Sequence, residues 1–246
     1  MQTPNYKDLL DAGCHFGHLK RKWNPKMRQY IFAERNGIHV IDLNSTLACM
    51  EHAGKALRSM AKAGKKILFV GTKKQSRSII AEAANSVGMP YVTERWLGGM
   101  MTNFVTVRKS VNKMHEIQAK LSNTSLETLT KKERLLLSRQ HEKLDRMFGG
   151  IAQFRNLPNA MIAVDVMHEH LALAEAKRLG LKTFGIVDTN SDPDSVDFAI
   201  PANDDASKSI RVIIGYLTEA IREGLEDRKK SKDDQPAAAT PAASAE

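Results

Sequence analysis

Short apolar runs alternate with amphipathic stretches along most of the chain. Continuous apolar character, typical of strands buried on both faces, marks the segments 38–43, 66–70, 160–165 and 183–188. Between these runs, apolar residues recur at helical spacing, over 44–63, 75–87 and 169–179. Alternation of this kind predicts an α/β fold with a mostly parallel sheet and helices on both faces.

The alternation is interrupted between residues 106 and 148 by two helix-patterned segments. The first carries one apolar stripe, made of Val107, Val111, Met114, Ile117 and Leu121, and the second carries another, made of Leu136, Leu137, Leu144, Met147 and Phe148. The short polar loop between them predicts an antiparallel helical hairpin, or coiled-coil arm. Thr130 and Glu133 have the spacing of a capping box, which places the start of the second helix directly after Thr130. A helix of about sixteen residues extends roughly 24 Å, so the hairpin can project as an arm.

This interruption suggests how the chain is organised. We expect the first part of the α/β core over 1–104, the hairpin over 105–148 and the second part of the core over 149–227. The remaining sequence, RKKSKDDQPAAATPAASAE, lacks large apolar residues and contains two prolines. Such a segment cannot bury enough surface to offset the entropy of ordering, so 228–246 is expected to be a disordered tail.

The charge balance narrows the class of partner. The chain has 37 lysines and arginines against 28 acidic residues, and its net charge of +9 favours polyanionic partners through counterion release. Two cysteines, and no apolar stretch of the roughly 18 residues that span a bilayer, indicate a protein of a reducing compartment without membrane contact. The N-terminus contains Asp8 and Asp11 and lacks the apolar core of a secretory signal, so we expect a cytoplasmic protein.

Cations gather beside aromatic residues at the ends of the predicted core. From His18 to Gly37 they surround Trp23, and the segment RWLGGMMTNF sets Trp96, expected to be exposed, beside a glycine pair and the basic hairpin. Phosphates bind such cations, and unpaired bases stack on aromatic rings, so we predict RNA contact. An equally weighted alternative for Trp23 is a packing role, in which its ring fills space against the folded domain. The predicted RNA-binding residues are Lys20, Arg21, Lys22, Trp23, Lys26, Arg28, Lys73, Lys74, Arg77, Arg95, Arg108 and Lys109.

The segment GTKKQS follows a predicted strand and opens a predicted helix. Backbone N–H groups at such a helix start attract phosphate, and Lys73, Lys74 and Arg77 would reinforce the attraction. The second glycine and the Lys–Ser/Thr pair of a Walker motif are missing, and the chain contains no G-x-G-x-x-G. The pattern therefore favours contact with a nucleic-acid backbone over a nucleotide site, and no small-molecule substrate is expected.

Acidic residues gather late in the chain. The carboxyl ends of parallel strands line a common crevice, so Asp188, Asp204 and Asp205 could converge on a divalent ion, Mg²⁺ or Zn²⁺. Aspartates are also the usual turn formers and helix caps, and this structural role is the interpretation we favour. The soft ligands of the chain match no closed zinc motif; they are Cys14, His15, His18, Cys49 and His52. No cofactor is expected to be required.

Several longer strings occur in the order found in one protein family. They are HFGH at His15, WNPKM at Trp23, RNGIHVIDL at Arg35, KILFVGTKKQ at Lys66, RWLGGMMTNF at Arg95, LTKKE at Leu129 and IVDTNSDPDSVDFAIPANDDA at Ile186. Together they resemble the bacterial type of ribosomal protein two of the small subunit. The resemblance runs from about residue 5 to residue 226.

This resemblance implies a flavodoxin-like or Rossmann-like sheet with an inserted helical hairpin. It further implies a cytoplasmic, ribosome-bound structural constituent of the small subunit that binds rRNA and neighbouring small-subunit proteins. Family members help to dock the large ribosomal protein one, which recruits mRNA for translation, and perform no catalysis. Two other classes stay open on the residues alone. One is an enzyme with a metal site at Asp188, Asp204 and Asp205, and the other is an adaptor that binds a partner helix through the hairpin's apolar stripe.

Overall fold

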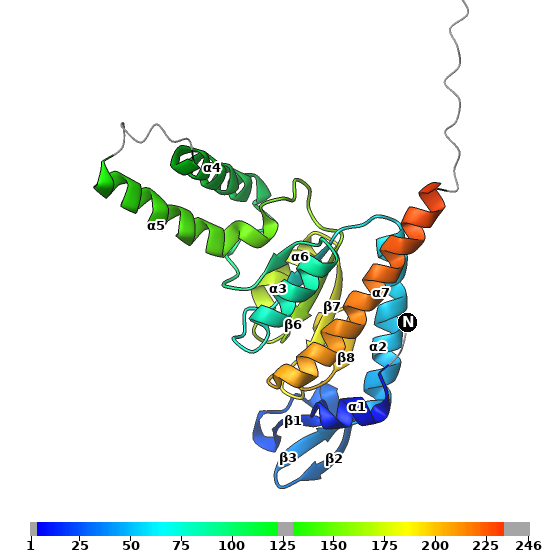
Figure 1. The fold of residues 1–246 in the computed structure, drawn as a ribbon. Coiled ribbons are helices and arrows are strands. Elements are labelled where there is room, and N and C mark those ends of the chain that lie inside the picture. Colours follow the sequence, from blue (N-terminus) through cyan, green and yellow to red (C-terminus); the bar gives the residue numbers. More distant parts are fainter. Residues whose placement is uncertain (1–3, 123–129, 234–246) are drawn as a thin grey trace, which may run out of the picture.

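A parallel β-sheet lies at the centre of the protein (Figure 1). The computed structural model describes residues 4–122 and 130–233. The sheet has five strands in the order β5-β4-β6-β7-β8, and their bounds are β4 Ile67–Val70, β5 Tyr91–Val92, β6 Ala160–Val164, β7 Lys182–Val187 and β8 Phe198–Pro201. All neighbouring strands are parallel. Counted within this sheet, the order is 2-1-3-4-5, the flavodoxin-like arrangement, so the predicted fold class is confirmed.

Helices cover both faces of this sheet because successive side chains of each strand point to opposite sides. In β4, Ile67 and Phe69 face a core completed by α1 (Tyr6–Asp11), α2 (Leu43–Lys62), α3 (Arg77–Ser86) and α7 (Ser207–Asp233). Leu68 and Val70 face the opposite core, which α6 (His170–Arg178) and the base of the hairpin complete. The continuous apolar runs of the sequence therefore mark strands that are buried on both faces.

A second, three-stranded antiparallel sheet lies beyond the N-terminal end of α2 (Figure 1). Its order is β1-β3-β2, with β1 Phe16–Leu19, β2 Ile31–Arg35 and β3 Ile38–Ile41. The prediction that 38–43 belongs to the parallel alternation is therefore wrong. The missed signal is Asn36-Gly37, whose φ angles of 52° and 73° form the two-residue turn between β2 and β3. An Asn-Gly pair in this left-handed conformation matches the twist of an antiparallel hairpin.

The predicted helical hairpin is present between β5 and β6, and it projects away from the sheet (Figure 1). It consists of α4 (Phe104–Ser122) and α5 (Lys131–Phe148). Thr130 caps α5 and forms the capping box with Glu133, as the sequence predicts. The first apolar stripe is largely buried, whereas Leu136 of the second is 56% exposed and lies outside the helix contact. The loop over 123–129 lies outside the described residues.

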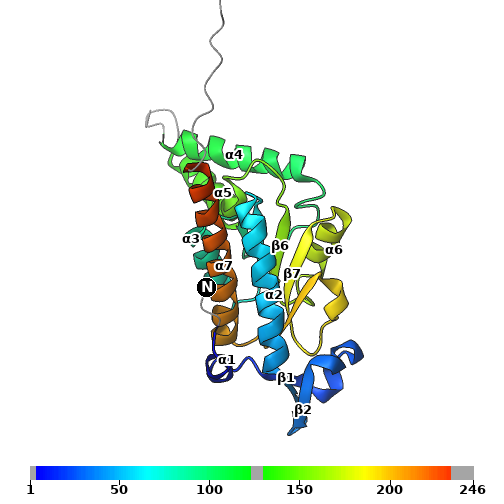
Figure 2. The ribbon, with the colours of Figure 1, turned by 90° about the vertical axis from the view of Figure 1, so that its right-hand side faces the viewer.

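The last helix continues beyond the predicted start of the tail. It ends at Asp233, so the expected boundary at residue 228 is too early, and residues 234–246 lie outside the described residues. The helix is held along α2 (Figure 2), where Arg58 forms ion pairs with Glu223 at 2.9 Å and with Asp227 at 2.9 Å. Among the helices of the described segments, none has the length and apolarity needed to cross a bilayer.

Candidate nucleic-acid interface and acidic centre

The N-terminal basic segment is folded and tied to the parallel sheet. Two short 3₁₀ helices, Lys20–Lys22 and Pro25–Tyr30, connect β1 to β2. The backbone N–H of Asn24 donates to the carbonyl of Thr189 at 2.8 Å, which joins this segment to the loop after β7. The ring of Trp23 is half-buried beside His39, with 5.2 Å between the ring centroids. This placement favours the packing role of Trp23 over the base-stacking role.

Several of the predicted RNA-binding cations already have partners within the protein. Lys20 pairs with Glu34 at 2.8 Å, and Arg77 pairs with Glu94 at 3.1 Å. Lys26 lies 2.8 Å from Asp192 and 2.8 Å from Asp194, and its hydrogen bond to Asp192 raises the pKa of the lysine above its ordinary value. These contacts give each cation a structural role in this fold.

Arg108 is similarly engaged at the base of the hairpin. Its guanidinium donates to the carbonyl oxygens of Ala152 at 3.3 Å and Phe154 at 2.9 Å. These bonds join the start of α4 to the chain that leaves α5. Arg108 thus holds the base of the hairpin, and its contact with RNA stays a prediction.

A second set of predicted cations is exposed to solvent. Within residues 4–122 and 130–233, the structure gives their side chains no hydrogen bond or ion pair; they are Arg21, Lys22, Arg28, Lys74, Arg95 and Lys109. The same holds on the hairpin for Lys113, Lys120, Lys131, Lys132, Arg134, Arg139, Lys143 and Arg146. Unlike the paired cations, these side chains can bind phosphate without breaking an internal contact.

The predicted exposure of Trp96 is wrong. Its side chain is 7% exposed and its indole N–H donates to Glu175 of α6 at 3.1 Å. The same carboxylate accepts backbone N–H groups from Gly99 at 2.7 Å, Met101 at 3.0 Å and Thr102 at 3.0 Å. Partial burial acts to raise the pKa of Glu175, but these donors outweigh it and hold the pKa below its usual value. The segment before the hairpin is thus an anchor that buries Trp96 and leaves Arg95 exposed to solvent.

The expected phosphate site at the start of α3 is filled by acidic side chains. Glu169 accepts the backbone N–H of Thr72 at 2.8 Å and its hydroxyl at 2.6 Å. The ammonium of Lys73 lies 2.6 Å from Asp165, 2.8 Å from Asp204 and 2.8 Å from Asp205. A phosphate here would meet carboxylates, which disfavours the predicted contact of Lys73 with RNA, whereas Lys74 is exposed and has no hydrogen-bond or ion-pair partner among the described residues.

These carboxylates form an acidic centre at the carboxyl ends of the parallel strands. Asp165 follows β6, Asp188 follows β7, and Asp204 follows β8. Their convergence agrees with the rule that ligand sites of such sheets lie at this edge. From β1, His18 approaches the same centre, with its Nδ1 atom 3.0 Å from the carboxylate of Asp188. The centre therefore joins both sheets.

The electrostatics of this centre are dominated by Asp204, which is fully buried. Burial, together with the charges of Asp165 and Asp188, raises the pKa of Asp204 to about 7, although Lys73 acts in the opposite direction. The hydrogen bond with Asp188 raises the pKa of His18. The single positive charge of Lys73 therefore does not balance the negative charges of the carboxylates around it.

The residues present fit a divalent cation. One nitrogen of His18 and one oxygen each of Asp188 and Asp204 lie within 4.8 Å of one another. Among the described residues, the buried Oδ2 atom of Asp204 has no hydrogen-bond partner. A set of one imidazole and two carboxylates suits Zn²⁺. Asp188 and Asp204 were predicted as metal ligands from the sequence. The third predicted ligand, Asp205, pairs with Lys73 instead, and His18 takes its place in the cluster.

Known proteins resemble this chain over most of its length. The family model of ribosomal protein S2 matches residues 9–224. The chain belongs to the ribosomal protein S2 family. It is 56% identical to the small ribosomal subunit protein uS2 of Cytophaga hutchinsonii over 93% of this chain and 90% of that protein. It is also 56% identical to the protein of the same name from Bacteroides thetaiotaomicron, over 97% of this chain and 86% of the relative. The resemblance inferred from the motifs is thereby confirmed.

Proposed function

We propose that this chain is a structural constituent of the small ribosomal subunit, where it binds rRNA and neighbouring proteins and catalyses no reaction. The observation that carries the proposal is the contrast between paired and unpaired cations. Lys20, Lys26 and Lys73 near the sheets are held by carboxylates, whereas the exposed cations of the hairpin, Arg108 apart, are unpaired within the described residues. A rigid, projecting, basic arm offers phosphate contacts that position a protein on folded RNA.

The test is the salt dependence of rRNA binding by the full chain. If about six phosphates are neutralised, log K falls with log salt with a slope of about −4 to −5. The variant Lys113→Glu/Arg139→Glu/Lys143→Glu should flatten this slope by about 2 to 3, because it removes three phosphate contacts. A suitable control is Lys55→Glu on α2, whose side chain is 79% exposed and lies away from the hairpin. Equal slopes for the triple variant and the wild type would contradict the proposal.

An exposed apolar surface next to α1 supports a protein neighbour. Tyr6, Leu10, Phe16 and Phe32 are between 43% and 77% exposed and line a cavity of about 470 Å³ beside the antiparallel sheet. Apolar side chains gathered in this way mark interaction sites rather than ordinary surface. We assign this surface to ribosomal protein one, the partner implied by the family.

This docking can be measured by calorimetry with purified ribosomal protein one. Phe32→Ser should weaken the complex without affecting the fold, because Phe32 is 77% exposed. The matched control is Leu171→Ser, which removes another exposed apolar side chain, 52% exposed, from α6. Equal affinities for both variants would remove the assignment.

We also propose that the acidic centre holds a divalent cation that joins the two sheets. His18, Asp188 and Asp204 would hold the ion, which would supply the missing positive charge. Zn²⁺ or Mg²⁺ at about one hundred times its Kd should stabilise the fold by about 2.7 kcal/mol, since it binds only the folded chain. Asp204→Asn should abolish this stabilisation. An unchanged melting temperature on adding either ion to the metal-free wild type would refute the ion, and ion-dependent nucleotide hydrolysis would favour the enzyme class instead.

A further inference from the structure

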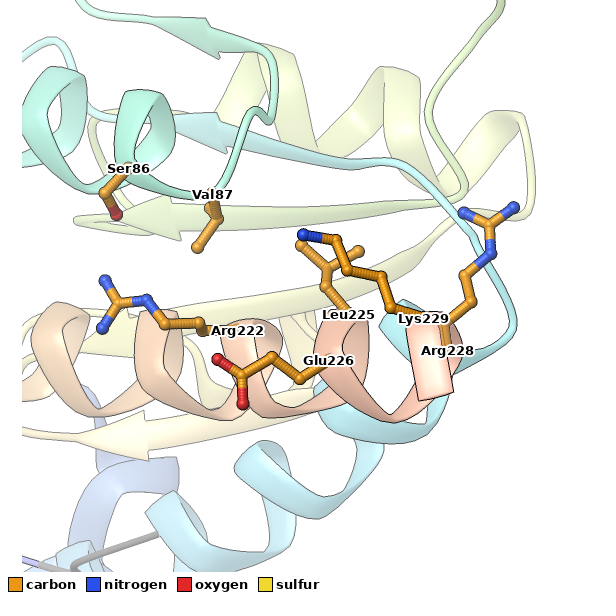
Figure 3. Close-up of a pocket in the computed structure, with 7 residues that line it drawn as sticks. All are labelled: Ser86, Val87, Arg222, Leu225, Glu226, Arg228 and Lys229. Carbon is orange, nitrogen blue, oxygen red and sulfur yellow. The ribbon is translucent and has the colours of Figure 1, made fainter. Parts of the chain in front are cut away.

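A cleft lies between the C-terminal end of α3 and the C-terminal half of α7 (Figure 3). It has a volume of about 520 Å³ and is lined by Ser86, Val87, Arg222, Leu225, Glu226, Arg228 and Lys229. The positions 222, 225, 226 and 229 recur at helical spacing, so one face of α7 forms the wall. None of the described lining residues belongs to the hairpin or to the N-terminal basic segment.

The cleft combines an apolar floor with a cationic rim. Val87 and Leu225 point into the space between the helices, the ammonium of Lys229 reaches toward it, and the guanidinium of Arg222 lies at its other end, directed away from Leu225 (Figure 3). Arg228 extends over the loop between α2 and β4, where its guanidinium lies against Gly64. A methyl group on Gly64 would be 2.5 Å from this guanidinium, so the glycine makes room for the arginine.

The acidic residues along this part of α7 are largely engaged elsewhere. Glu223 and Asp227 pair with Arg58 on the side facing α2, and Glu219 takes one nitrogen of the Arg222 guanidinium. A guanidinium carries five N–H donors, so Arg222 keeps capacity for a further acceptor. Lys62, Lys65 and Lys66 lie close to Gly64 in sequence, Lys230 follows Lys229, and all four are exposed. Among the described residues that line the cleft, Glu226 is the one carboxylate, beside Arg222, Arg228 and Lys229, so the rim carries an excess of positive charge.

We propose that this cleft binds an unpaired nucleotide of RNA, with its base on Val87 and Leu225 and its flanking phosphates on Arg222, Arg228 and Lys229. The inference rests on the proposed rRNA binding and names a second surface for it. A volume of about 520 Å³ suits a small-molecule-sized group, because such sites occupy roughly 300–1,000 Å³. Sequence-dependent RNA recognition uses unpaired bases of this kind, since their faces are apolar and their edges can form hydrogen bonds.

Glu226 gives this site a base preference. A carboxylate in a phosphate-binding cleft repels the backbone, but it accepts hydrogen bonds from the amino group of cytosine. Uracil is of similar size and presents a carbonyl oxygen at that position, which the carboxylate repels. The cleft should therefore prefer cytosine to uracil, and Glu226→Gln should reduce this preference.

The experiment uses the full chain with fluorescent oligocytidylate and oligouridylate of about eight nucleotides, within the range that one single-strand-binding domain covers. Arg222→Glu/Lys229→Glu should flatten the salt slope for oligocytidylate by about 1.4, because each of two single-strand phosphates contributes roughly 0.7. The matched control, Lys208→Glu/Arg211→Glu, makes the same charge change in the first two turns of the same helix and should leave the slope unchanged. Wild type should bind oligocytidylate more tightly than oligouridylate.

Three outcomes would overturn this inference. Equal effects of the two double variants would show that only net charge matters. Equal binding of the two oligonucleotides by wild type would remove the role of Glu226. Displacement of oligocytidylate by oligoglutamate at equal concentration would indicate a general anion or acidic-protein surface. None of these results affects rRNA binding through the hairpin, whereas a wild-type chain that binds no rRNA would refute the proposed function itself.

Discussion

Glu175 holds the segment that precedes the hairpin, and replacing it with glutamine tests how that segment is anchored. One carboxylate oxygen accepts the indole N–H of Trp96 and the backbone N–H of Gly99. The other accepts the backbone N–H groups of Met101 and Thr102 and the Thr102 hydroxyl. In Glu175→Gln, an NH₂ group replaces one of these oxygens. In either orientation of the amide, backbone or indole N–H donors then face another donor.

The magnitude follows from the donors that lose their acceptor. Each buried donor left unsatisfied costs about 1–3 kcal/mol, and loss of a charge-assisted bond lies in the same range. Because Thr102 is exposed, water can replace part of the loss on that side. We expect Glu175→Gln to lower the free energy of unfolding by about 2–4 kcal/mol at pH 7.

The same variant has a defined pH dependence. The folded-state pKa of Glu175 lies below its unfolded value of 4.5, so the stabilisation is fully present above that pH and is lost as pH falls through the folded pKa. The difference in unfolding free energy between wild type and Glu175→Gln should therefore be largest at neutral pH and shrink in acid. Urea unfolding followed by circular dichroism measures it, with the exposed Glu82→Gln as control. A loss below 1 kcal/mol at pH 7, or a loss that does not change in acid, would refute this account of the anchor.

Three further predictions concern single contacts. In α7, Gly215→Ala should stabilise the fold by about 1 kcal/mol, because the exposed glycine has open space around it. Gly224→Ala should destabilise the fold by about 1–3 kcal/mol, because the added methyl group would meet the carbonyl of Arg58. Urea unfolding measures both changes, and shifts of the same sign in the two variants would contradict this prediction. Thr130→Ala should lower the unfolding free energy by about 1 kcal/mol through loss of the α5 cap, and no change would count against the cap. Lys22→Gln should flatten the salt slope of rRNA binding by about 0.9, while Lys26→Gln, whose lysine is already paired, should not; the reverse order would contradict the distinction between free and paired cations.

Local signals predicted the parts of the fold that depend on neighbouring residues. The hairpin follows from helical spacing and from the capping box at Thr130, and both are determined within a few turns of chain. The buried strands follow from their continuous apolar runs, and the parallel sheet follows from the helices between them. The prediction for residues 38–43 was wrong because a short apolar run does not indicate which strand it pairs with. Asn36-Gly37 carried that information and predicts an antiparallel partner.

Contacts between distant residues could not be predicted in this way. Trp96 was expected to be exposed because it lies beside cations and a double-glycine hinge, but its partner, Glu175, lies on α6. His18 joins Asp188 because Gly17 lets β1 approach the loop after β7, where a side chain on Gly17 would meet Thr189 at 2.6 Å. The convergence of Asp188 and Asp204 was predictable, since parallel strands end at one edge of a sheet. The approach of His18 to these aspartates was not predictable, because His18 lies on a strand of the other sheet.

The fold changes how the net charge of +9 is to be interpreted. A uniform excess of cations would predict binding spread over the whole surface, with every lysine contributing alike. Here carboxylates of the sheet edges hold Lys20, Lys26 and Lys73, while the hairpin leaves its cations to solvent. Long-range attraction depends on all of these charges, but only an unpaired cation can bind a phosphate without losing an internal ion pair. Charge reversal on the hairpin should therefore reduce the affinity for rRNA more than the same charge change on α2.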